Sequence, residues 1–123
     1  MFFIQFNQLL VGMILAVVGV APFSRATMAQ VEVSKASYSL PGCRAFLGHN
    51  NSVSPIIQGF CLGTISGVSI IEQERAIVCS PKDVLLIEMV RLVVLFVEQR
   101  PERMQEHLPV LASEALKAAW PCR

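Results

Sequence analysis

Residues 82–100 read KDVLLIEMVRLVVLFVEQR, and this stretch is apolar from Val84 to Val97. Only Glu88 and Arg91 interrupt the apolar run. A helix that is apolar on nearly all sides is normally surrounded by protein, and this run is too short to span a membrane. Because Glu88 and Arg91 are three residues apart, they would share one solvent-facing edge and pair weakly. We therefore expect this segment to be the central helix of an all-α bundle.

The same helix-start signal, a serine followed by a proline, occurs at Ser54-Pro55 and at Ser80-Pro81. In each, a serine that can cap the helix precedes a proline, which is favoured at the first helical position. The first signal predicts a helix from Pro55 to about Ile71, and the second would open the central helix. Glycines 59, 63 and 67 are four residues apart and share one face of the first of these helices. They cost roughly 2 to 3 kcal/mol of helix propensity, so we expect another helix of the domain to pack closely on Gly59, Gly63 and Gly67.

The two ends of the domain have different patterns. Residues 108–119 carry apolar side chains at helical spacing, and Trp120-Pro121 ends that pattern, so a last helix is expected there. Residues 30–42 are mostly polar and are broken by Pro41-Gly42, which predicts an N-terminal arm with about one helical turn. The expected fold is a small, disulfide-stapled bundle of three to four helices after an N-terminal signal peptide.

The N-terminal segment has the features of an export signal. An apolar stretch from Leu9 to Phe23 precedes the small-residue segment SRATMA, and cleavage after Ala26 or Ala29 would place small side chains at −1 and −3. Residues 1–8 contain no Lys or Arg, so an uncleaved membrane anchor from Phe2 to Phe23 is the alternative. We expect a signal peptide over residues 1–29 and one domain over residues 30–123, located outside the cytoplasm in either case.

All four cysteines, Cys43, Cys61, Cys79 and Cys122, follow this segment. An even number of cysteines in an exported domain predicts disulfides, although sequence allows three connectivities. An up-and-down bundle favours Cys43–Cys61 with Cys79–Cys122, and the alternative is Cys61–Cys79 with Cys43–Cys122. Zinc sites bring their ligands in close pairs such as CxxC, and no such pair occurs here, so no metal is expected.

Composition argues against several classes of function. Without Arg25 the basic side chains fall from ten to nine, which equals the nine acidic ones, so nucleic acid is not an expected partner. His49 is expected in a loop and His107 next to the start of a helix, and neither is expected to be catalytic. Ser66 lies in GTISG, which lacks the spacing of a nucleophile elbow. We expect no enzymatic activity and no cofactor, and contact with a membrane only through an uncleaved N-terminal segment.

Four segments of this sequence resemble one known family. They are GFCLGTISGV at 59–68, Cys-Ser-Pro at 79–81, FVEQRPE at 96–102 and ALKAAWPC at 115–122. Together they resemble the Rap/Tai family of type VI secretion immunity proteins over about residues 43–122. The chain departs from the family pattern at Thr64, Glu88 and Phe96, and its link over residues 72–78 is short.

The resemblance implies an α-helical periplasmic protein that binds a secreted effector, often a peptidoglycan amidase, and blocks its active site. Two exposed segments are expected to touch such a partner. One contains Glu72, Glu74 and Arg75, and the other contains Arg100, Glu102 and Arg103. Each could equally well be an ordinary solvated loop. Homo-oligomerisation is left open. The alternative function is an envelope structural or stress-related protein without a toxin partner, and a more distant one is a carrier of a small apolar ligand.

Overall fold

The computed structural model describes residues 32–49 and 51–123, which belong to one compact unit. These residues form four α-helices and a short 3-10 helix, and they contain isolated β-bridges but no strand. The elements are α2 (Ala36–Phe46), α3 (Pro55–Glu74), α4 (Leu86–Glu98), η1 (Pro101–Arg103) and α5 (Leu108–Ala119). The predicted all-α class is confirmed. The predicted signal peptide and both cleavage positions lie outside the described residues.

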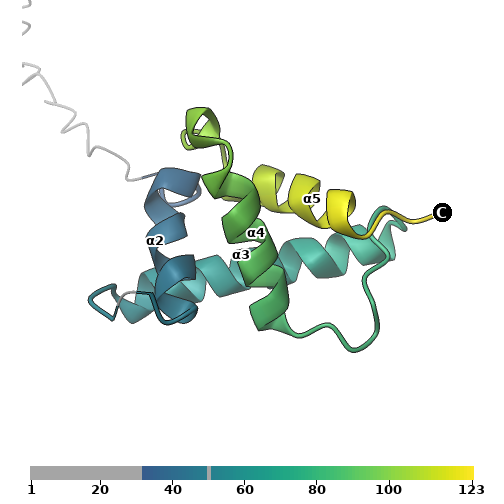
Figure 1. Cartoon of the computed structure of the whole chain (residues 1–123), viewed down its shortest axis with the longest axis horizontal. Helices are drawn as coiled ribbons and strands as arrows, with labels where there is room; N and C mark the ends of the chain where they lie inside the picture. Colours follow the sequence, from purple (N-terminus) through teal and green to yellow (C-terminus); the bar gives the residue numbers. More distant parts are fainter. Residues whose placement is uncertain (1–31, 50) are drawn as a thin grey trace, which may run out of the picture. The chain divides into compact units, whose positions relative to one another are not determined.

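The buried side chains of α4 form the middle of the core. Val90, Val93 and Val97 are fully buried, and α4 packs against α2, α3 and α5 (Figure 1). The other helices contribute a second set of fully buried side chains, which are Leu40, Ile65, Leu108, Leu111 and Leu116. An ion pair between Arg44 Nε and Glu98 Oε1, 2.7 Å apart, also links α2 to α4. The expectation of a central apolar helix is therefore confirmed.

The first half of the described chain both confirms and corrects the expected helix boundaries. Ser54 caps α3 as predicted, because its Oγ accepts a hydrogen bond from the Ile56 N–H at 3.3 Å. The expected N-terminal arm is instead mostly α2, although Pro41 lies inside it. Ala36 and Leu40 of this helix are fully buried, so burial of an apolar face outweighs the backbone hydrogen bond that a proline removes.

The start of α4 was predicted at Ser80-Pro81, and this was wrong. The helix begins at Leu86, and Glu88 Oε2 accepts a hydrogen bond from the Leu85 N–H at 3.0 Å. Glu88 therefore caps the helix, and it forms no ion pair with Arg91 among the described residues. The solvent-facing edge is also wider than expected, since Leu95 is 52% exposed.

Within residues 32–49 and 51–123, no other helix packs against the glycines of α3, which corrects the prediction for Gly59, Gly63 and Gly67. A Cβ atom at any of these positions would meet no neighbouring atom within 4 Å. The close helix–helix approach occurs at Gly42 instead, where a Cβ would lie 2.6 Å from the Ile57 carbonyl carbon. By length and composition α3 is apolar enough to cross a membrane, and only 17% of its most apolar window is buried.

Both disulfides have the connectivity that an up-and-down bundle favours. Cys43 bonds to Cys61 and joins α2 to α3, with 5.4 Å between the two Cα atoms. Cys79 bonds to Cys122, with 4.9 Å between the Cα atoms. The Cys79 N–H also donates to the Trp120 carbonyl oxygen at 2.8 Å. The segment after α3 is thereby attached to the segment after α5.

Candidate functional site

The six charged residues expected to meet a partner do not form one cluster of free side chains. Glu72 and Arg103 both reach α5, where they bond to the neighbouring residues Ser113 and Glu114. The others differ in how exposed they are and in what they bond. Each group is therefore considered by its contacts.

Arg103 holds η1 against α5. Its guanidinium donates to Glu106 at 2.8 and 2.6 Å, and to Glu114 at 2.5 and 2.9 Å. These hydrogen bonds hold the pKa of both carboxyls below its usual range and raise the pKa of Arg103. Because the guanidinium already donates to two carboxylates, few of its N–H groups can bind another molecule. We therefore assign Arg103 a structural role.

Glu72 is also engaged within the domain. Its Oε1 accepts a hydrogen bond from the Ser113 hydroxyl at 2.9 Å, which joins α3 to α5. Its Oε2 is buried and has no hydrogen-bond partner among the described residues. An acceptor that solvent does not reach is poorly placed for a partner protein, so Glu72 is better explained as part of the α3–α5 contact.

Glu74, Arg75 and Glu102 fit the original expectation better. All three are exposed, and their side chains form no hydrogen bond or ion pair within the part of the chain that the structure describes. Arg75 follows the last residue of α3 and Glu102 lies in η1. These three residues remain candidates for contact with a partner.

Arg100 differs from the other five because it lines an open groove between α4 and α5. The groove has a volume of about 760 Å³. Its apolar walls are Leu92, Leu95 and Phe96 from α4, Ala115, Ala118 and Ala119 from α5, and Trp120 beyond it. Leu95 is exposed, and Phe96 and Trp120 are half-buried. The sequence signal for this groove was the apolar character of α4 on nearly all sides, which we interpreted as burial everywhere except at the edge of Glu88 and Arg91.

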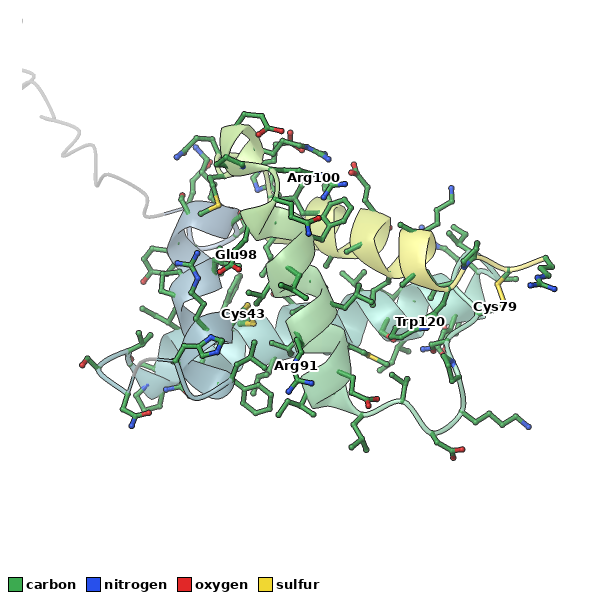
Figure 2. The ribbon with its side chains drawn as sticks, viewed as in Figure 1. Cys43, Cys79, Arg91, Glu98, Arg100 and Trp120 are labelled. Carbon is green, nitrogen blue, oxygen red and sulfur yellow. A yellow bond between two sulfur atoms is a disulfide. The ribbon has the colours of Figure 1, made fainter. Side chains whose placement is uncertain are left out.

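The loop over residues 80–85 closes one end of this groove, and Pro81, Asp83 and Val84 line it there. Pro81, Lys82 and Asp83 are exposed. The Cys79–Cys122 disulfide precedes the loop and the Glu88 cap follows it. Figure 2 shows Cys79 and Trp120 at the C-terminal end of α5, from which the loop returns to the start of α4. The loop and the groove form one continuous surface, which we call the loop–groove surface.

Groups with reactive chemistry are few in the described residues. No group of three or more His, Cys, Asp or Glu side chains in residues 32–49 and 51–123 could hold a metal ion. His49 is exposed, and His107 Nδ1 lies 2.8 Å from Ser34 Oγ just before α5. This contact joins the segment before α2 to the segment before α5, so His107 is better explained by packing between the two segments than by chemistry.

A family model described as Rap1a immunity proteins matches residues 35–122. No curated protein and no solved structure matches significantly. The matched range begins just before α2 and ends at Cys122, so it includes every helix and both disulfides of the described residues.

Proposed function

The chain belongs to the Rap1a family of immunity proteins, and on this premise we propose that it binds and neutralises a secreted toxin that degrades the cell wall. The proposed toxin is of the amidase class and is delivered by type VI secretion. The family match is the observation that carries the proposal. It suggests a role that is not catalytic, in which the protein acts by binding a partner.

The proposed location is the periplasm, where an amidase would reach peptidoglycan. Two disulfides support an oxidising compartment, because they are rare in the cytoplasm of ordinary cells. The apolar segment from Leu9 to Phe23 would direct export, followed by cleavage after Ala26 or Ala29 or by anchoring in the membrane. Each alternative leaves the helical domain facing peptidoglycan.

For the mechanism, we propose that the loop over residues 80–85 enters the active-site cleft of the toxin. A blocking element must be ordered before it binds, because ordering it on binding costs affinity. The disulfide on one side of this loop and the cap of α4 on the other restrict it. Its exposed Pro81, Lys82 and Asp83 would contact the cleft.

The proposal is tested with a secreted peptidoglycan amidase, sought first among the genes adjacent to the gene of this protein. The hydrolase is directed to the periplasm of a host with and without the whole chain, and lysis is followed by optical density. We expect survival only with this protein. Exchanging the loop charges, Lys82→Glu with Asp83→Lys, should reduce protection, whereas Lys117→Glu on exposed α5 should not.

Two outcomes would contradict parts of the proposal. Lysis at the same rate with the folded wild-type protein, for a hydrolase that it also does not bind, would favour the envelope structural role instead. Full protection by the loop variant would keep the immunity function but reject the loop as the blocking element.

A further inference from the structure

The groove between α4 and α5 has the form of a docking site for a polypeptide segment. It follows α4 from Glu88 to Gln99, which corresponds to roughly 17 Å at about 1.5 Å per residue. Its floor is apolar and it is open to solvent along this length. Leu95 is 52% exposed in the middle of it. Grooves of this kind bind segments that present an apolar face.

Arg100 provides a positioned positive charge at one end of the groove. Its Cζ lies 3.7 Å from the centre of the Phe96 ring, and its Nη1 donates to the Phe96 carbonyl oxygen at 2.8 Å. The nearby Glu114 is already bonded by Arg103. The other N–H groups of Arg100 therefore have no carboxylate partner among the described residues. A guanidinium held in one orientation loses less entropy when it binds a carboxylate.

The charges along the groove are unevenly distributed. Arg91 borders it and has no side-chain partner within the described residues. Asp83 and Glu88 lie at the opposite end from Arg100, and the Glu88 carboxylate is occupied by the Leu85 N–H. Figure 2 shows Arg91 and Arg100 toward opposite ends of α4. An occupant with a carboxylate near Arg100 complements this distribution, whereas at the loop end its carboxylate would meet Asp83 and Glu88 beside Arg91.

We propose that the groove binds an apolar segment of the toxin that carries a carboxylate, and that this carboxylate pairs with Arg100. The inference rests on the proposed function for the identity of the partner. It adds a second contact beside the blocking loop, because the two parts of the loop–groove surface are continuous. The apolar side chains of the segment would cover Leu95, Phe96 and Trp120.

The first test uses defined peptides and reads out Trp120, the only tryptophan of the chain. Two amidated helical peptides of about twelve residues share a leucine face and differ only in one terminal Glu or Lys. They are titrated into oxidised protein purified from cells expressing the whole chain, and tryptophan fluorescence is recorded. We expect the Glu peptide to bind about tenfold more tightly, and Arg100→Gln to remove the difference. Lys117→Gln, which removes a charge outside the groove, should not.

The second test uses the hydrolase of the lysis experiment and a pair of variants at one exposed position. Leu95→Glu and Leu95→Lys lose the same apolar contact but place opposite charges in the groove. We expect the Glu variant to bind the hydrolase at least tenfold more weakly than the Lys variant. Circular dichroism and thermal unfolding would establish that both variants fold.

The outcomes separate this inference from the proposed function. Equal binding of both peptides, or no Trp120 response to either, overturns the groove inference while protection against lysis can still hold. Equal hydrolase binding by both Leu95 variants does the same. Self-association that both Leu95 variants abolish would instead assign the groove to a second copy of the chain. If the peptides behave as expected but no hydrolase binds, the proposed function fails and the groove site remains.

Discussion

Gly42 and Gly63 are both helical glycines, but the atoms around them differ. A Cβ at Gly42 would lie 2.6 Å from the Ile57 carbonyl carbon, closer than nonbonded atoms approach in proteins. The contact lies next to the Cys43–Cys61 disulfide, so neither backbone can easily move away. At Gly63 the same atom would meet nothing within 4 Å. Gly42 must therefore lack a side chain, whereas glycine at position 63 only lowers the helix propensity of α3.

Alanine at these two positions should therefore have opposite effects. Gly42→Ala should lower the free energy of unfolding by about 1 to 3 kcal/mol through overpacking. Gly63→Ala should raise it by roughly 0.5 to 1 kcal/mol, because alanine is the better helix former. Chemical denaturation of the oxidised protein measures both values. A Gly63→Ala variant as unstable as Gly42→Ala would show that the exposed face of α3 is packed in solution.

At the scale of elements, Arg103 joins parts of the chain that have little other contact. It lies in the 3-10 helix η1 and bonds to Glu106 in the following turn and to Glu114 in α5. The segment between α4 and α5 is thus held by charge rather than by an apolar face, since no residue of η1 is buried. Its stability should depend on pH.

The sign of this dependence follows from the pKa shifts. Arg103 lowers the pKa of Glu106 and Glu114 below the ordinary 4.5 in the folded protein. The unfolded state therefore binds more protons as the pH falls through this range. The stabilisation is complete above about pH 4.5 and is lost as the pH falls through the two folded-state pKa values. Arg103→Gln should lower the melting temperature at pH 7 but not at pH 2. The same decrease at both pH values would contradict an electrostatic role.

At the scale of the whole molecule, the two disulfides close loops of different length. Cys43–Cys61 spans 18 residues and joins two helices that already pack together. Cys79–Cys122 spans 43 residues and attaches the segment before α4 to the end of the chain. The longer loop restricts the unfolded chain more, and its disulfide also restrains one end of the loop over residues 80–85, which we propose as the blocking element.

Removing each disulfide separately tests this difference. Replacing Cys79 and Cys122 by alanine should cost about 4 kcal/mol of unfolding free energy, and replacing Cys43 and Cys61 about 3 kcal/mol. Only the loss of Cys79 and Cys122 should also weaken hydrolase binding by the protein that remains folded. Guanidinium denaturation would measure the two unfolding free energies. Hydrolase binding would be measured at a temperature where both variants are folded. A larger cost for the 43–61 pair would show that packing around the disulfide outweighs loop length.

Much of the fold could be predicted from near neighbours in the chain. Ser54-Pro55 marks the start of α3 because the capping hydrogen bond joins residues two apart. The apolar spacing of residues 108–119 gives α5 its observed bounds. The favoured disulfide pairing is the observed one, although Cys79 follows α3 and meets the segment after α5 instead of opening α4 as expected. These features depend on local backbone geometry or on the order of the helices.

The groove and the roles of the charged residues could not be obtained from the sequence. Arg100 and Arg103 look equivalent in the sequence, yet one faces the groove and the other is occupied by Glu106 and Glu114. The apolar character of Leu95 did not reveal that α5 leaves it exposed. The amino-acid sequence was sufficient for the all-α class, the start of α3 and the bounds of α5, because hydrogen bonding and helical periodicity act over a few residues. Which apolar side chains stay exposed, and which charges stay free, depended on how distant helices pack.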